Sequence, residues 1–363
     1  MKITKKLMTL LLVSSVVIGN NITFVNAAEA EDKTIDPMQE TISNLEKGYS
    51  EYYNISNVKT ELISNNQTTG YVENFYIVEM DAILKANSVE EMDYYQGVSN
   101  YCSIATVDND QLSETETSHI NMLTAEKANI YNELNEYIGK EQSLKFYVKE
   151  TYPTDNESEK IILFENGEDY VTWEEMLPLN RETLQEEGYA KMESINTEND
   201  SAQQANLSYS YSVADAVSYM TRYTSNPSSC NGCDDPNCQY YVDTEKYNPN
   251  YTHYASNHND CANYLSQALS NGGIPEDDTW KPNSRAWINV TSLTNYMTSN
   301  GYWSSITYNV LQKGDVLRFK SGSHIVMITS FDGTTYRYSG HTNDRLNYVI
   351  RPTSSTAYYY RVG

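Results

Sequence analysis

The stretch Asp260-Cys261-Ala262-Asn263-Tyr264-Leu265-Ser266-Gln267-Ala268-Leu269 places one cysteine at the predicted start of a short amphipathic helix. Its apolar residues recur at helical spacing, at Ala262, Leu265, Ala268 and Leu269. Asp260 is a candidate N-cap, and Gly272-Gly273 predicts the end of the helix. Cys261 would then lie where unpaired backbone N–H groups and the helix dipole favour a thiolate, so we expect a pKa below the ~8.5 of a free thiol.

A second informative stretch is Phe331-Asp332-Gly333-Thr334, in which Asp-Gly separates two runs of alternating residues. This dipeptide predicts a two-residue hairpin turn, which would pair Phe331 with Thr334 and place His324 opposite His341. Directly opposed residues have Cβ atoms ~4.5 to 5.5 Å apart, so we expect both imidazoles on one face of a sheet.

Together these residues predict a thiol nucleophile, a base and a group that orients the base. Cys261 is the candidate nucleophile, His324 the candidate base, and His341 the group that holds the tautomer of His324. Asn343 and Asp344 are alternatives for the orienting role, although they follow the predicted strand. Backbone N–H groups at the start of the cysteine helix would hold an oxyanion. The alternative interpretations are a packed thiol and strand histidines with surface roles.

The first 27 residues have the features of a signal peptide. Three lysines precede a mainly apolar run at 7–18, and small residues follow near 25–27. An apolar core of about 12 residues is shorter than the ~20 that a bilayer span needs. We therefore expect a soluble mature chain without an integral membrane segment, secreted and either extracellular or associated with the cell wall.

Charge is distributed unevenly along the chain, whose net charge is −24. Residues 31–200 contain 36 Asp plus Glu against 11 Lys plus Arg, whereas residues 201–363 contain 12 against 11. This change predicts an acidic α+β domain of unknown role at 31–195, a linker at 196–208 and a second domain at 209–363. So acidic a chain is a poor candidate for binding nucleic acid.

Periodicity predicts the elements of both halves. In the first half we expect helices at 38–53, 90–98 and 118–138, and strands at 56–64, 70–82, 143–151 and 160–165. In the second half we expect helices at 212–223 and 291–299 besides the cysteine helix, and strands at 315–320, 324–331, 335–341 and 348–351. The predicted class is α+β: helices packed on an antiparallel sheet, preceded by a separate α+β domain.

Three further cysteines fall within nine residues, at Cys230, Cys233 and Cys238. In an exported chain they predict one disulfide with a thiol left over, or a metal clip completed by His253, His258 or an aspartate. A second Cys-x-x-Cys is missing, so we prefer the disulfide and assign neither a metal nor a cofactor.

Several motifs occur in an order that resembles the amidase domain family of secreted bacterial proteins. They are the stretch 260–269, Gly272-Gly273, Lys313-Gly314-Asp315-Val316, His324-Ile325-Val326-Met327-Ile328 and His341-Thr342-Asn343-Asp344. That family is similar to the NlpC-type and CHAP-type papain-like cysteine hydrolases. The resemblance covers about residues 209–351 and implies a papain-like fold with Cys261 as nucleophile, His324 as base and a third polar residue on the following strand.

The resemblance also implies amide or peptide bonds of bacterial cell-wall peptidoglycan as the substrate. Two alternatives stay open: an acyl transferase or transpeptidase that uses the same thioester, and a noncatalytic wall-binding module on the same fold. Neither the scissile bond nor the oligomeric state follows from the sequence.

Overall fold

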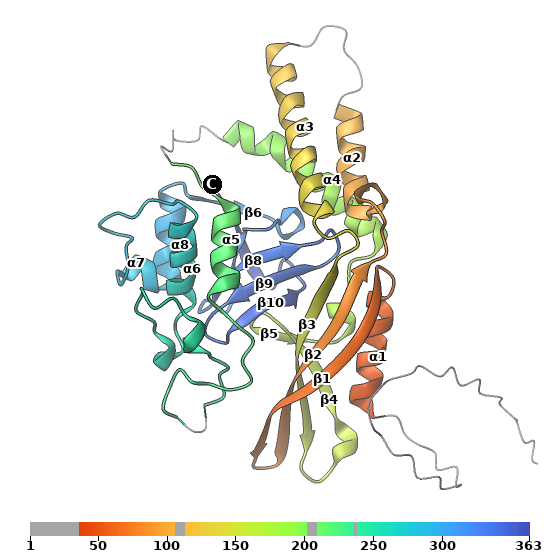
Figure 1. Ribbon diagram of the computed structural model, residues 1–363, viewed down its shortest axis with the longest axis vertical. Coiled ribbons are helices and arrows are strands. Elements are labelled where there is room, and N and C mark those ends of the chain that lie inside the picture. Colours follow the sequence, from red (N-terminus) through yellow and green to blue (C-terminus); the bar gives the residue numbers. More distant parts are fainter. Residues whose placement is uncertain (1–35, 106–112, 202–208, 236–237) are drawn as a thin grey trace, which may run out of the picture. The chain divides into compact units, whose positions relative to one another are not determined.

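The computed structural model describes residues 36–105, 113–201, 209–235 and 238–363, with the backbone alone for 196–201. The predicted signal peptide lies outside these residues, as does part of the predicted linker, 202–208. The described chain combines helices with one large sheet, which confirms the α+β class (Figure 1). The papain-like fold stays a prediction.

The first half of the chain contains long strands and three helices that follow the predicted pattern closely. Its elements are α1 (Pro37–Tyr49), β1 (Tyr53–Thr68), β2 (Tyr71–Leu84), α2 (Asp93–Ala105), α3 (Glu114–Asn135), β3 (Glu141–Pro153), β4 (Ile161–Asn166), β5 (Asp169–Val171) and α4 (Arg181–Ser201). The sequence did not predict α4, which extends into the range expected to be a linker.

The second half begins with helices and ends with short strands. Its elements are α5 (Val213–Arg222), α6 (Cys261–Asn271), α7 (Arg285–Ile288), α8 (Val290–Ser299), β6 (Trp303–Ile306), β7 (Val316–Phe319), β8 (Ile325–Phe331), β9 (Tyr336–Gly340), β10 (Arg345–Ile350) and β11 (Ala357–Val362). Short 3-10 turns connect several of these elements, among them η4 (Thr244–Lys246) and η5 (Ala255–Asn257) before α6.

Strands from both halves belong to one sheet, in the order β1-β2-β3-β10-β9-β8-β7-β11-β6, with β4 and β5 paired beside β3. The two halves meet where β10 runs parallel to β3, with Tyr348 opposite Lys145. Residues 36–363 form one compact unit. The structure therefore does not confirm the predicted separate N-terminal domain. One hydrophobic core contains buried residues from both sides of the change in charge near residue 200.

The central strands of the sheet are covered on both faces, and their alternate residues divide between the two layers. Ile325 and Met327 of β8 belong to a core shared with α5, α6 and α8. Val326 and Ile328, which point the other way, belong to a core shared with the N-terminal half. The helices α5, α6 and α8 lie on one side of β8 and β9 in Figure 1. The acidic half thus supplies the second layer of the sheet that carries the candidate base.

Buried charge pairs also connect the two halves. Arg345 of β10 donates from Nε and Nη2 to the two carboxylate oxygens of Glu165 in β4, at 2.8 and 2.7 Å. The Tyr338 hydroxyl donates to the same carboxylate at 2.9 Å. Because this paired geometry satisfies an almost fully buried guanidinium, it fixes β4 against β9 and β10.

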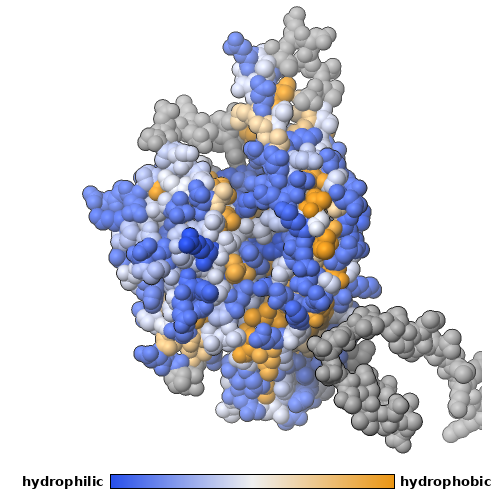
Figure 2. All heavy atoms as spheres, in the orientation of Figure 1, coloured by the Kyte–Doolittle hydropathy of each residue, from blue (hydrophilic) through white to orange (hydrophobic). Residues whose placement is uncertain are grey.

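The surface is mostly hydrophilic on the face shown in Figure 2, with apolar patches over the region of the N-terminal strands. Leu62 of β1 and Ile161 of β4 are among the exposed apolar side chains, at 53% and 59% exposure. In the described part of the chain, every helix is too short or too polar to cross a membrane.

Candidate functional site

Cys261 begins α6, as the sequence predicts, and its side chain is 4% exposed. All residues from 261 to 269 are buried, because β8 covers one side of α6 and α5, α7 and α8 lie around the others. The polar residues on this helix therefore need partners inside the protein. Asn263 accepts from Nε1 of Trp287 at 2.9 Å, and Gln267 accepts from the hydroxyl of Tyr219 at 2.6 Å.

The Cys261 thiol lies against the start of β8. Its Sγ donates to the carbonyl oxygen of Ser323 at 3.7 Å, the residue immediately before His324. The backbone of Ile325 and the hydroxyl of Thr342 also contact the sulfur. The structure thus brings the predicted nucleophile to the segment that carries the predicted base.

Burial raises the pKa of the Cys261 thiol to about 11, and this corrects the expectation of a lowered value. The loss of hydration outweighs the contributions of the Ile325 and Ala262 backbone and of the nearby Thr342 side chain, each of which favours the thiolate. The sequence indicates the helix N-terminus correctly, but it does not show that β8 and the neighbouring helices bury this end of α6.

His324 is partly buried, and its ring stacks on Phe319 with centroids 5.5 Å apart. Burial, with the nearby charges of Arg345 and His341, lowers the pKa of His324 to about 4. The imidazole is therefore neutral at physiological pH. Its Nδ1 atom is buried without a hydrogen-bond partner, so this nitrogen is available for a thiol or a substrate.

The thiol and the imidazole line two adjacent cavities. Cys261 lines a cavity of about 700 Å³, whereas His324 lines one of about 350 Å³. Asn259 and Ser323 line both cavities. Among the described residues, the thiol donates to Ser323 rather than to the imidazole. The thiol and the imidazole are thus both neutral, so the structure does not confirm the expected thiolate.

The predicted pairing of His324 with His341 is wrong, because the hairpin turn is longer than two residues. Phe331 pairs with Tyr336 rather than with Thr334, and a bulge separates Ile328 from Ser330. The carboxylate of Asp332 accepts from the backbone N–H groups of both residues that follow Gly333, at 3.1 and 2.9 Å, which closes a wider turn. A one-residue shift sends side chains to the opposite face.

His341 has its own buried partners. Its Nδ1 lies 2.7 Å from a carboxylate oxygen of Asp260, and its Nε2 lies 2.8 Å from the carbonyl oxygen of Tyr223. The ring is stacked between Tyr247 and Tyr264, with centroids 3.7 and 3.5 Å away. Both nitrogens are engaged, so in this arrangement neither holds His324. The catalytic role of His341 stays a prediction.

Asp260 does not cap α6 through its side chain, contrary to expectation. Its carboxylate instead bonds to His341 and accepts from the backbone N–H of Tyr254 at 2.7 Å and from Nδ2 of Asn263 at 2.9 Å. These bonds fix the residue immediately before Cys261. The signal in the sequence that could have indicated this role is an aspartate immediately before the cysteine that begins the predicted helix.

The two alternative orienting residues lie in different surroundings. Asn343 lines the cavity of His324, and its Oδ1 accepts from the backbone N–H of Tyr241 at 3.1 Å. Asp344 is fully buried and accepts from the backbone N–H of Asp243 and from the hydroxyl of Tyr247. Asn343 is thus the alternative that shares a cavity with the base.

The sequence did not indicate that the N-terminal half lines the site. Glu168 and Tyr170, from the β4–β5 hairpin, line the cavity of His324. The hydroxyl of Ser323 donates to the carboxylate of Glu168 at 3.1 Å, and burial raises the pKa of this carboxyl. Nothing in the local sequence of this hairpin distinguishes it from an ordinary surface turn.

The remaining cysteines and histidines divide between the N-terminal half and the loop before α6. Cys102 lies buried on α2 and His119 on α3. Cys230, Cys233 and Cys238 form no disulfide in the structure, which does not confirm the preferred interpretation of that loop. Cys230, Cys238 and His258 have potential metal-ligand atoms within 4.8 Å of one another.

Comparisons with known proteins agree with the resemblance seen in the motifs. Residues 210–361 match the family model described as "Putative amidase domain", which supports amide hydrolysis as the activity of this region. A curated relative from Bacillus subtilis (strain 168), the uncharacterized protein YjcM, is 33% identical over 123 residues, which cover 28% of this chain and 30% of the relative. The chain thus spans about three tenths of that relative's length. No solved structure matches.

Proposed function

We propose that the protein is a cysteine amidase that cleaves amide or peptide bonds through a Cys261 acyl-enzyme. One observation carries this proposal: the thiol at the start of α6 lies against Ser323 and Ile325, the residues on either side of His324, whose imidazole is neutral. The match of residues 210–361 to an amidase domain supports the same activity.

The proposed reaction uses the imidazole as a base and then as an acid. His324 takes the proton from Sγ as the sulfur attacks the amide carbonyl. The C–N bond then breaks, and the imidazolium returns the proton to the leaving amine. Water next attacks the thioester while His324 accepts its proton, and the thiol leaves with that proton. The products are an amine and a carboxylic acid, and the enzyme is regenerated.

This reaction requires the thiol to exchange Ser323 for His324 as its hydrogen-bond partner. A substrate chain that enters between the two cavities would contact Asn259 and Ser323, which line both. We propose that this contact brings the thiol and Nδ1 of His324 together and raises the thiolate population at neutral pH.

We propose supporting roles for two further residues. His341 acts as a positioning residue, because its bond to Asp260 fixes the backbone that precedes Cys261. Asn343 is the candidate for orienting His324 during the reaction, since the two residues share a cavity. Backbone N–H groups at the start of α6 are the candidate oxyanion donors.

Bacterial cell-wall peptide is the substrate that we propose, and the proposed location is outside the cell. The predicted signal at 1–27 supports export, and the resemblance to secreted hydrolases supports the wall as the target. An acidic protein surface is compatible with a peptide polymer and unfavourable for nucleic acid.

Digestion of purified wall polymer tests this proposal. The mature chain should release fragments with new amino termini, detected by mass spectrometry, whereas Cys261→Ala should lower the rate on the order of 10³-fold or more. Cys102→Ala, which removes a thiol from the other half, should retain activity. New cross-links in place of new amino termini would instead indicate acyl transfer. Equal activity of the Cys261→Ala and unchanged chains would exclude the cysteine mechanism.

The burial of Cys261 favours a second candidate, a noncatalytic wall-binding module. A thiol with a pKa near 11 is almost wholly protonated at neutral pH. This candidate predicts that the unchanged chain and Cys261→Ala cosediment equally with wall polymer and release no fragments. Release of fragments by the unchanged chain alone would exclude it.

A further inference from the structure

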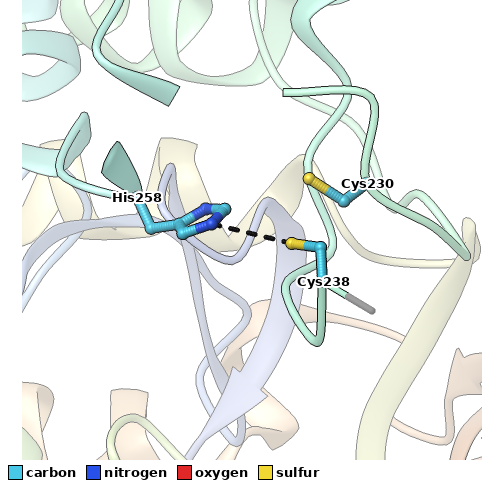
Figure 3. Close-up of side chains that lie close together, drawn as sticks. All are labelled: Cys230, Cys238 and His258. Carbon is cyan, nitrogen blue, oxygen red and sulfur yellow. Dashed lines mark hydrogen bonds between the residues drawn. The ribbon is translucent and has the colours of Figure 1, made fainter. Parts of the chain in front are cut away.

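The loop before α6 brings together the three clustered cysteines and a histidine. Cys230 and Cys238 lie with His258 in a group whose ligand atoms are within 4.8 Å of one another. Nε2 of His258 is 3.6 Å from Sγ of Cys238, and the side chains of all three residues point toward one another (Figure 3). Sγ of Cys233 lies 3.8 Å from Sγ of Cys230, and Cys233 also contacts Cys238, although Cys233 is not part of the group within 4.8 Å.

Two of these separations match edges of a tetrahedral zinc site. Zn–S and Zn–N bonds of about 2.3 and 2.0 Å place two sulfur ligands about 3.8 Å apart, and a sulfur and a nitrogen about 3.5 Å apart. The observed distances are 3.8 Å for Cys230 with Cys233 and 3.6 Å for Cys238 with His258. Three sulfurs and one imidazole are a ligand set typical of structural zinc.

Backbone N–H groups point at the sulfurs in a repeated pattern. The N–H of Gly232 donates to Sγ of Cys230 at 3.3 Å. The backbone of Asp235 donates to Cys233, and that of Tyr240 donates to Cys238. In each case the donor lies two residues after the cysteine. Backbone N–H groups in this position can donate to sulfur ligands of a metal and so orient them.

The fold holds the ligands in place from both ends of the loop. Cys230 bridges to Val242, and the N–H of Asn231 donates to the carbonyl oxygen of Val242 at 2.9 Å. A side chain at position 232 would lie 2.8 Å from Val242 and 3.1 Å from Ala255, so glycine permits this close packing.

The imidazole has its own support. His258 follows η5 with a φ of 51°, and its N–H donates to the carbonyl oxygen of Ala255 at 2.9 Å. Its ring stacks on Tyr240 with centroids 3.8 Å apart. The left-handed backbone and the stacked tyrosine together direct Nε2 toward Cys238.

We infer that Cys230, Cys233, Cys238 and His258 bind one zinc ion that stabilises the loop preceding α6. Soft sulfur ligands favour zinc over calcium or magnesium. The small core beneath the loop consists of Val242, Tyr247 and Ala255 with part of Cys230. So small a core contributes little stability to this long irregular loop. The loop therefore depends on a further cross-link, which a metal ion would supply.

The site also adjoins the candidate catalytic cavities. His258 and Tyr240 line the cavity of His324, and Asn259, the next residue, lines both cavities. Zinc would thereby fix the segment that leads to Cys261. The inference does not depend on the proposed function, because a structural zinc ion is compatible with an enzyme or a binding module.

Elemental analysis of the full mature chain, purified without chelator, tests this inference. We expect one zinc per chain and loss of that zinc in Cys238→Ser and His258→Ala. The matched controls are Cys102→Ser and His253→Ala, which should retain one zinc. His253 is near the cluster but outside it, against Tyr247. Absence of zinc from the unchanged chain, or retention in both ligand variants, would overturn the inference.

Thiol counting keeps the test decisive if a ligand variant fails to fold. The unchanged chain contains five cysteines. Denatured in chelator without reductant and alkylated, it should label at all five and release one zinc to a chromogenic chelator. A disulfide within the cluster would leave two unlabelled and would contradict the zinc site. Refolding of the metal-free chain should then require added zinc, and equal refolding with and without zinc would argue against a structural role.

Discussion

Asp260 and His341 form a buried polar pair immediately before the candidate nucleophile. The two side chains are 1% and 2% exposed. Each nitrogen of the His341 ring faces an oxygen atom, one from the Asp260 carboxylate and one from the Tyr223 carbonyl. The stacked rings of Tyr247 and Tyr264 enclose that ring. His341 therefore fixes the position of Asp260, the residue before Cys261, and would act on the reacting atoms only through that residue.

Replacement of His341 should destabilise the folded chain strongly. His341→Ala leaves the Asp260 carboxylate buried without its partner, which costs about 3 to 5 kcal/mol. Urea unfolding of the purified chain measures this loss. His119→Ala, on α3, is the control and should change the free energy of unfolding by less than about 0.5 kcal/mol. A small effect of His341→Ala would argue against a positioning role.

Glu187 is a buried carboxyl on α4, in the N-terminal half, and it should make the stability of the folded chain depend on pH. Burial raises its pKa to about 8, although Arg351 and the Tyr336 hydroxyl act in the opposite direction. The folded chain keeps the proton while the unfolded chain loses it above its ordinary pKa of 4.5. The contribution of Glu187 is thus fully present below pH 4.5 and is lost as pH rises toward 8, at about 1.4 kcal/mol per pH unit.

Glu187→Gln should remove this part of the pH dependence. We expect its free energy of unfolding to decline less steeply between pH 5 and 8 than that of the unchanged chain. Glu186→Gln, the exposed neighbour on α4, should retain the original slope. Parallel curves for all three chains, measured by urea titration at several pH values, would show that Glu187 is ionised when folded.

Single residues were predictable where local chemistry determines them. The start of α6 at Cys261 follows from the apolar periodicity, and its end follows from the paired glycines. The pKa of that thiol was not predictable, because it depends on the helices that enclose α6 and on residues far away in the chain. The same holds for His341, whose partners come from distant segments.

At the scale of elements, the turn between β8 and β9 depends on one carboxylate. Asp332 accepts from two backbone N–H groups, from the hydroxyl of Tyr53 at 3.0 Å and from Nη2 of Arg337 at 2.9 Å. Both side chains of the ion pair are buried. The Asp-Gly dipeptide correctly predicts a hairpin, but these tertiary bonds select a longer turn and so determine the register.

Asp332→Asn should destabilise the chain by about 3 to 5 kcal/mol, because it leaves the Arg337 guanidinium buried and unpaired. Asp278→Asn is the matched control. Asp278 forms an exposed pair with Lys281, and its loss should cost about 0 to 1 kcal/mol. Thermal or urea unfolding distinguishes the two variants, and equal effects would show that the turn does not depend on the buried pair.

For the whole molecule, most helices and strands were predictable from periodicity, but their assembly was not. The composition of the chain changes near residue 200, yet β10 pairs with β3 across that change. Val326 and Ile328 are buried in a core that includes residues of the N-terminal half, whereas the sequence of β8 shows only four apolar residues in a row at 325–328. Such a run predicts a strand that is covered on both faces, but it does not indicate which segments of the chain cover it.

The second half should therefore be unstable by itself. A fragment of residues 209–363 would expose the face of β8 and β9 that packs on the N-terminal half, and it would leave Arg345 without Glu165. We expect an aggregating fragment with a broad unfolding transition, in contrast to a soluble, cooperatively folding full chain. A monomeric fragment with the same unfolding midpoint as the full chain would contradict the shared sheet.

The most direct measurement of the central proposal is the detection of an acyl group on Cys261. The mature chain is mixed with wall peptide and quenched in acid within the first turnovers, then digested and analysed by mass spectrometry. The account predicts that the peptide containing Cys261 carries the mass of the acyl fragment as a thioester, and that His324→Ala forms it far more slowly. Amide cleavage with an unmodified Cys261, or cleavage that persists in Cys261→Ala, would contradict it.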